Sequence, residues 1–346
     1  MIEQYTITTT QKYNFPQTTI GTTLPKRLIQ LSLQTLNNNF QQTPQENAFA
    51  IQPKLQPILL KPKTTPVIVA AVDTSSIKIG ETSLGTLIAI RGANVWKQNS
   101  CYRYIRLGPF IFHITEKNKK EVYTALQNTY FNAVHNTQTT PNLQQMPNRM
   151  ANILERWLQK MLSKTMTDGL ILIDGSLTGG MPDTPTHAMR EILETARKMG
   201  NTVLAFSKMT SLRFNGHLIT EALPVHKPPY MLETVGLKPK PPMVLFGSVY
   251  VAKLSRGNCA FRLDIDKEIP SAEQVGAVEK LLGNDLFIQS YPETLRLAHI
   301  LCTFTANEVI AMQRFVTRKY GIKIVNRPDM HRLLFGVYGK GEGENT

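Results

Sequence analysis

Cysteine and long apolar runs are both scarce in this chain, and each scarcity excludes a class of protein. The three cysteines, Cys101, Cys259 and Cys302, lie far apart and form no CxxC pair. Neither a disulfide framework nor a structural zinc site is therefore expected, and a catalytic thiol is not expected either. No apolar run approaches the roughly 20 residues that a membrane-spanning helix needs. We expect small buried cysteines and no membrane association.

Acidic residues are also few, and the N-terminal segment lacks the features of a secretory signal. The 39 Lys and Arg residues outnumber the 25 Asp and Glu residues, which gives a formal net charge of +14 and a pI near 9.6. Such a balance favours a polyanionic partner, with nucleic acid first and a membrane surface as the rival. No basic amphipathic stretch supports the membrane surface. Because residues 1–6 offer neither a basic flank nor a hydrophobic core, we expect a cytoplasmic protein.

Two apolar runs end in the same way. Residues 67–73 (VIVAAVD) and 169–174 (GLILID) are short runs of aliphatic residues, each closed by an aspartate and followed by small residues. A run of this length and composition predicts a strand that is buried on both faces. If the strands are neighbours, Asp73 and Asp174 lie side by side at the sheet edge, where their mutual repulsion favours divalent cations. The alternative is that both aspartates begin ordinary turns.

The order of the predicted elements indicates an α/β fold. Three strands with short links come first, which predicts antiparallel neighbours, at residues 67–73, 87–96 and 102–114. An amphipathic helix is predicted next, over 150–162. A parallel crossover unit follows it, with a strand over 170–174, a helix over 188–199 and a strand over 202–206. This succession is an RNase H-like mixed sheet, with three antiparallel strands, helix-linked parallel strands and flanking helices.

The chain is long enough for one large domain or two modest ones. We expect residues 1–65 to form an arm, 66–325 the α/β domain with a helical C-terminal part, and 326–346 a tail. Within the domain, the proline- and lysine-rich segment 223–242 predicts a stiff basic loop without regular structure, and the turn after Asp73 is expected at 75–85.

A third carboxylate is predicted to complete the site. The helix before Asp174 packs across the two strand ends, and Glu155 borders its apolar stripe. Glu155 is the best candidate by geometry, the alternative being a solvated glutamate. Such oxygen ligands suit Mg²⁺ or Mn²⁺ rather than zinc, and two such ions can support phosphodiester hydrolysis. The pair Asp264 and Asp266 has no third ligand nearby and is expected to be solvated.

Basic residues and one histidine lie around the predicted site. Lys208 and Arg213 follow the strand at 202–206, at the same sheet edge, where they could hold a phosphate or stabilise its charge. Arg156 could contact phosphate or balance local charge. His299 lies two turns into a C-terminal helix, the element that commonly supplies the last metal ligand in an RNase H-like fold. The alternatives are solvated basic side chains and a structural histidine.

Taken together, these residues resemble the NurA family of archaeal and bacterial nucleases. The match covers most of the chain from Val67 to about Lys319. Its specificity lies in the order of the motifs and in the final Tyr-Pro…Leu…Ala-His element. The matching segments are Val67–Asp73, Glu155, Leu170–Ser176, Val203–Lys208, Phe261–Asp264 and Tyr291–His299.

The resemblance implies a fold, an activity and partners. It implies an RNase H-like, Mn²⁺-dependent nuclease, with Mg²⁺ as the alternative ion, that acts on single- and double-stranded DNA with 5′-to-3′ polarity. It also implies a homodimer that works with the hexameric HerA translocase in DNA end resection and double-strand break repair. By the same resemblance, Asp73, Glu155, Asp174 and His299 are metal ligands and Tyr291 is an active-site residue.

One position departs from the family pattern. The first motif usually reads Asp-Gly-Ser, and here Thr74 follows Asp73. Thr74 is expected to restrict the turn and to crowd the backbone near the metal. Two other functions stay open. One is a DNA-binding subunit with an inactive site, and the other is an RNase H-like ATPase, which would need two such domains with paired phosphate loops.

Overall fold

The structure is a computed structural model of the chain, and it describes residues 52–53, 56–131, 140–214, 217–221, 223 and 226–325. Every described residue belongs to the unit Ala48–Thr346. Most of the expected N-terminal arm and all of the expected C-terminal tail lie outside the described residues.

Three long antiparallel strands form one side of the main sheet. They are β3 (Val69–Glu81), β4 (Gly85–Gln98) and β5 (Cys101–Thr115), as the short links predict. The expectation of a turn at 75–85 is wrong. Strand β3 continues past Asp73 to Glu81 and pairs with β4 on both sides of a bulge between Lys78 and Gly80. The residues after Asp73 keep β-branched side chains, including Ile77 and Ile79, that support a strand. Asp73 therefore lies within a strand rather than at its end.

A parallel crossover unit extends the sheet beside β3. Strand β6 (Leu170–Asp174), helix α4 (Thr186–Lys198) and strand β8 (Thr202–Ser207) follow one another, and β6 lies parallel to both β3 and β8. The β3–β6 ladder ends where Val72 faces Ile173, so Asp73 and Asp174 are the next residues on adjacent strands. The expected RNase H-like mixed sheet is confirmed.

Five further strands complete the ten-stranded sheet, whose main path runs β1-β11-β13-β14-β8-β6-β3-β4-β5. They are β14 (Phe261–Asp266), β13 (Gly247–Lys253), β11 (Tyr230–Val235), β2 (Ile58–Leu59) and β1 (Gln52–Pro53). Three short pairs lie apart from it: β7 (Thr178–Gly179) with β12 (Val244–Leu245), β9 (Arg213–Phe214) with β10 (His217–Leu218), and β15 (Phe287–Ile288) with β16 (Tyr291–Pro292).

One expectation fails at β11, and two short strands from residues 1–65 pair with it. The segment 223–242 is not wholly irregular, because the proline-free stretch Tyr230–Val235 pairs with β13 and buries Met231 and Leu232. Strands β1 and β2 come from the expected arm, yet both pair with β11. The domain built on the main sheet therefore begins before residue 66.

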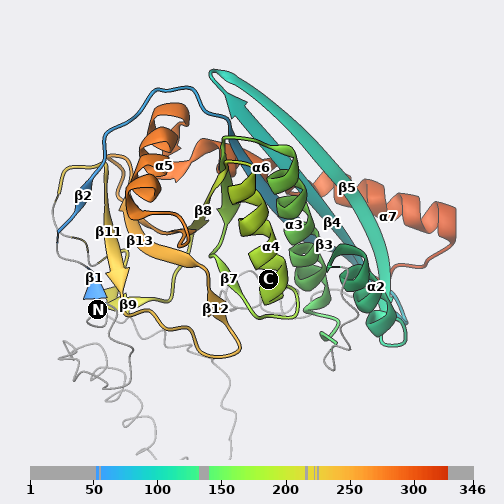
Figure 1. Cartoon of the computed structure of the whole chain (residues 1–346). Helices are drawn as coiled ribbons and strands as arrows, with labels where there is room; N and C mark the ends of the chain where they lie inside the picture. Colours follow the sequence, from blue (N-terminus) through green and yellow to red (C-terminus); the bar gives the residue numbers. More distant parts are fainter. Residues whose placement is uncertain are drawn as a thin grey trace, which may run out of the picture. The chain divides into compact units, whose positions relative to one another are not determined.

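Helices cover both faces of the sheet (Figure 1). On one face, α2 (Lys119–Phe131), α3 (Met146–Thr165) and α4 share a core with β3 and β6. On the other face lie α5 (Ser271–Asn284), α6 (Glu293–Cys302) and α7 (Ala306–Tyr320). Among the described helices, none is long and apolar enough to cross a lipid bilayer.

Helix α7 is fixed to the sheet through Glu308. Thr305 and Glu308 form a capping box at its N-terminus, and Gly321 is its C-cap. The Glu308 carboxylate also binds the nearly buried Arg91, at 2.8 Å between Nη2 and Oε1, and Arg106 at 3.1 Å. Hydrogen bonds from Arg91 and from Thr305 lower the pKa of Glu308 to about 2.

We predict that Glu308→Ala lowers the free energy of unfolding by about 2 kcal/mol, because it removes the Glu308 carboxylate from the capping box and leaves Arg91 without its ion-pair partner. Because the pKa of Glu308 is lowered in the folded protein, its carboxylate contributes its full stabilisation at pH values above its ordinary pKa of 4.5. This stabilisation is lost as the pH falls toward 2. Urea unfolding at neutral and acid pH measures both effects. Glu273→Ala is the matched control, since Glu273 is exposed at the same position of α5, and a similar loss there would contradict the account.

Candidate active site

Two aspartates meet at the point where strand β6 ends. Asp73 is buried in β3, with 5% of its surface exposed, and Asp174 is the last residue of β6. Because the two strands run parallel in register, both carboxylates arise at the same level of the sheet. The predicted juxtaposition of the two aspartates is therefore present in the fold, although Asp73 reaches it from mid-strand.

A basic side chain accompanies each aspartate. His299 on α6 places its Nδ1 2.7 Å from Asp73 Oδ2, and Lys208, directly after β8, places its Nζ 2.5 Å from Asp174 Oδ2. The hydrogen bond with Asp73 raises the pKa of His299, and burial only partly opposes this. Burial raises the pKa of Asp174, while Lys208 acts in the opposite direction. The two carboxylates thus depend on cationic neighbours.

Helix α3 brings the carboxylate of Glu155 near Asp73 and Asp174, and its role as a metal ligand stays a prediction. Glu155 is 8% exposed. Burial is the largest cause that raises its pKa to about 7; Arg156 lowers it, and the charges of Asp73 and Asp174 raise it further. Near neutral pH the metal-free protein therefore holds Glu155 as a mixture of protonated and ionised forms. Three carboxylates from three elements act on one another as a single electrostatic cluster.

Tyr291 borders this cluster from the short strand β16. Its ring packs edge-on against Phe206 and Phe261, with centroids 6.3 and 5.3 Å away, and Lys208 Nζ lies 5.5 Å from the ring centroid. Its hydroxyl is buried and has no hydrogen-bond partner among the described residues. Burial, followed by Asp174, raises the pKa of Tyr291, so the phenol stays protonated. It offers an O–H donor beside the acidic cluster.

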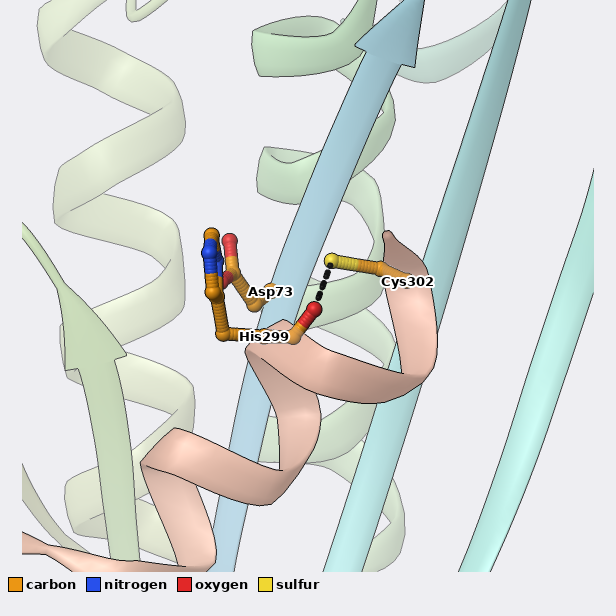
Figure 2. A group of neighbouring side chains, drawn as sticks. All are labelled: Asp73, His299 and Cys302. Atoms are coloured by element: carbon orange, nitrogen blue, oxygen red, sulfur yellow. Dashed lines mark hydrogen bonds and ion pairs between the residues drawn. The ribbon is translucent and has the colours of Figure 1, made fainter. Parts of the chain in front are cut away.

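Cys302 is the neighbour that the sequence did not suggest for the site. Donor atoms of Asp73, His299 and Cys302 all lie within 4.8 Å of one another, and Figure 2 shows the three side chains. The Cys302 thiol, however, donates to the His299 carbonyl at 3.2 Å. Burial, with Asp73 and Glu155 adding to it, raises the pKa of this thiol. The group therefore stays a neutral, buried thiol, which is a poor metal ligand.

The donor set fits a hard divalent cation. Asp73, Glu155 and Asp174 supply carboxylate oxygens, and His299 supplies a ring nitrogen. The observation behind this fit is the donor set itself, in which the buried carboxylates of Asp73 and Glu155 lie near Asp174 and His299. Oxygen-rich ligation of this kind is typical of Mg²⁺ and Mn²⁺.

The two predicted arginines occupy different surroundings. Arg156 lies largely buried, with its Nη1 2.6 Å from Gln159 Oε1 and its Nη2 3.6 Å from Glu155 Oε1. It balances the charge of Glu155. Arg213 is exposed in β9. Its role as a DNA contact stays a prediction.

Contrary to expectation, Thr74 does not lie in a turn that could crowd the site. No turn begins there, because β3 continues, and the Thr74 side chain contacts α3 instead, with Oγ1 3.2 Å from Ala151 O and 3.4 Å from Glu155 Oε2. Strand alternation explains this, since residues next to each other point to opposite faces. Gln159, which follows Glu155 by one helical turn, also contacts Glu155, and only that spacing could have revealed it.

The expectation that Asp264 and Asp266 are solvated is wrong. Both are buried, because β14 lies inside the sheet between β13 and β8. Asp264 accepts two hydrogen bonds from Arg262 and one, at 3.0 Å, from the backbone N–H of Leu177. Asp264 therefore fixes the loop after β6, whereas Asp266 pairs with Arg197 of α4.

Comparisons with known proteins return solved structures alone. No protein-family model matches the chain, and no curated protein matches it. The NurA nuclease from Sulfolobus solfataricus is 15% identical, with 86% of this chain and 97% of that chain covered and a TM-score of 0.47. A NurA structure bound to dAMP and manganese is 10% identical, with 85% and 96% covered and a TM-score of 0.47.

A third similar structure is endonuclease V from Ciona intestinalis, in complex with a 24-mer DNA that contains an inosine. It is 9% identical, with 74% of this chain and 92% of that chain covered and a TM-score of 0.35. The structures found thus include the family that the sequence resembles. At such identities and TM-scores the likeness carries no argument about activity.

We predict that His299→Ala weakens Mn²⁺ binding about tenfold or more, whereas Cys302→Ala leaves it unchanged. The raised pKa of His299 also means that a proton competes with the ion at and somewhat above pH 6.5, so the wild-type affinity should increase with pH across that range. Calorimetric titration of the metal-free protein measures both. Equal losses in the two variants, or a loss of thermal stability alone in His299→Ala, would remove His299 from the ligand set.

Proposed function

We propose that this protein is a divalent-metal-dependent nuclease that hydrolyses phosphodiester bonds of DNA. The observation that carries the proposal is the cluster of Asp73, Glu155 and Asp174, whose charges act on one another although they come from two strands and a helix. The resemblance to the NurA motifs supports the same function. Lys208 and His299 complete a constellation that suits phosphoryl chemistry.

The proposed cofactor is Mn²⁺, with Mg²⁺ as the alternative. Asp73, Glu155, Asp174 and His299 would hold it. When bound, the cation supplies Lewis-acid stabilisation of the charge that develops on the scissile phosphate. The NurA structure that contains dAMP and manganese is in keeping with this choice of ion.

Side chains of the protein are proposed to contact the phosphate, donate hydrogen bonds and release protons. The Lys208 ammonium, more than a third exposed, is placed to contact a phosphate oxygen next to Asp174. The protonated Tyr291 hydroxyl is a hydrogen-bond donor with no partner of its own in the described structure, and it suits a phosphate or leaving-group oxygen. His299 must release its proton before it ligates a metal. Glu155 likewise binds a cation only as the carboxylate.

DNA is the proposed substrate because the chain is strongly basic. A net charge of +14 attracts the phosphate backbone whatever its base sequence. We propose Lys208 and Arg213 as backbone contacts, with Arg156 as a third DNA-binding residue. Endonuclease V, one of the similar structures, is also seen with DNA.

The finer function follows from the sequence resemblance alone. We propose 5′-to-3′ exonuclease activity with single-strand endonuclease activity, in DNA end resection during double-strand break repair. We further propose a homodimer, a HerA-type hexameric translocase as partner and a cytoplasmic location. A DNA-binding subunit with an inactive site is the alternative.

We predict that Asp73→Asn and Asp174→Asn each abolish cleavage of end-labelled DNA in Mn²⁺ while DNA binding survives, because the loss of one ligand disrupts the metal geometry. Gel analysis of products from both strand ends also gives the polarity. Glu191→Gln, a half-exposed glutamate on α4 that pairs with lysines, is the control and should cleave normally. A wild-type protein that binds DNA without cutting it would support the inactive-subunit alternative, and cleavage by either variant would refute the site.

We also predict that DNA affinity falls steeply with salt and depends little on sequence. The slope of log affinity against log salt should be about −0.9 per phosphate contact on duplex DNA, so Arg213→Ala should make it shallower by about one. Fluorescence anisotropy across a salt series measures this. An affinity that is flat in salt, or a strong preference for one base sequence, would contradict the proposed binding mode.

A further inference from the structure

Each oxygen of the Glu155 carboxylate has a donor group of the protein beside it, and the Thr74 hydroxyl shares its single proton between Glu155 Oε2 and the nearer Ala151 O. Gln159 Nε2 donates to Oε1 at 2.8 Å, and the Thr74 hydroxyl lies 3.4 Å from Oε2. The two donors come from opposite sides, one from the next turn of α3 and the other from β3. A carboxylate held in this way loses the freedom to rotate about its terminal bonds.

Thr74 touches two of the three carboxylates at once. Its backbone N–H donates to Asp73 Oδ1 at 2.7 Å, while its hydroxyl lies between Ala151 O and Glu155 Oε2 on the other face of the sheet. Gly92, the partner of Thr74 in β4, leaves room for the Leu158 side chain of α3, because a Cβ there would lie 2.4 Å from Leu158 Cδ1. The packing of α3 on the sheet thus sets the Thr74–Glu155 contact.

Gln159 is completely buried, and its amide has one orientation that satisfies its neighbours. Arg156 Nη1 donates to Gln159 Oε1 at 2.6 Å, so the carbonyl end of the amide faces the guanidinium. The amide nitrogen must then point to Glu155 Oε1, where it is found. A buried amide is costly unless both ends are paired, and here both are paired only if Glu155 keeps its place.

We propose that Thr74 and Gln159 are positioning residues that hold the Glu155 carboxylate in the orientation that binds the divalent cation. The inference rests on the proposed metal site and deepens it, because it assigns a role to the residue at which this chain departs from the family's glycine. Groups that orient a metal ligand are typically worth 10- to 100-fold in metal affinity. Neither residue touches the metal or the substrate.

The test compares substitutions that keep or remove the donor. Thr74→Val removes the hydroxyl at nearly constant volume and should weaken Mn²⁺ binding about tenfold, whereas Thr74→Ser keeps the hydroxyl and should restore it. Gln159→Leu should weaken binding to a similar or greater extent. Calorimetric titration of the full-length, DNA-free protein gives the affinity, thermal unfolding gives the stability, and DNA cleavage at several Mn²⁺ concentrations shows whether added metal recovers activity.

Two control substitutions remove similar buried donors elsewhere. Thr234→Val removes a hydroxyl that donates to Val249 O, and Gln274→Leu removes an amide that donates to Ile269 O. Both should lower the melting temperature and leave the Mn²⁺ affinity unchanged. Thr74→Val and Gln159→Leu should show the opposite pattern. Their Mn²⁺ affinity should fall, while their melting temperature should change less than that of the controls.

The possible outcomes separate this inference from the proposed function. If Thr74→Val and Thr74→Ser bind Mn²⁺ equally and cleave DNA equally, the positioning role is overturned and the nuclease stands. If the donor-dependent affinity is present but the wild-type protein does not cleave DNA, the positioning role stands and the nuclease proposal fails. If the wild-type protein binds no Mn²⁺, both are overturned.

Discussion

Repulsion among three carboxylates is the constraint on which the rest of this site depends. The negative charges of Asp73 and Asp174 raise the pKa of the buried Glu155, and that of Asp73 also raises the pKa of Asp174, although burial is the larger cause for both. The fold supplies His299, Lys208 and Arg156 as cationic neighbours, one for each carboxylate. Burial, with the charges of Asp73 and Asp174 adding to it, nevertheless raises the pKa of Glu155. A divalent cation is the simplest agent that would balance the three carboxylate charges.

The architecture explains why the carboxylates meet. The parallel register of β3 and β6 sets Asp73 level with Asp174, and α3 packs against β3 so that Glu155 reaches the same place. Helix α6 brings His299 from the opposite face. Each face of the sheet therefore contributes to one cluster at the point where the β6 strand stops.

Local patterns in the sequence were enough to predict much of this arrangement. Short apolar runs ending in aspartate, with helix periodicity between them, predict the mixed sheet and place Glu155 on the correct helix. Features that depend on distant partners were not predictable. Strand β3 passes Asp73 because β4 continues to pair with it, Tyr230–Val235 forms a strand because β13 lies beside it, and Asp264 is buried because strands flank it on both sides. The direction of the Thr74 side chain depended on that same continuation of β3.

The central claim is that these three carboxylates form a single divalent-cation site, and anomalous diffraction from crystals soaked in Mn²⁺ tests it most directly. The account predicts an anomalous peak within bonding distance of Asp73, Asp174 and Glu155 oxygens, with the Lys208 ammonium close by. A well-ordered site without a peak at millimolar Mn²⁺, or a peak bound only by residues outside this cluster, would contradict it.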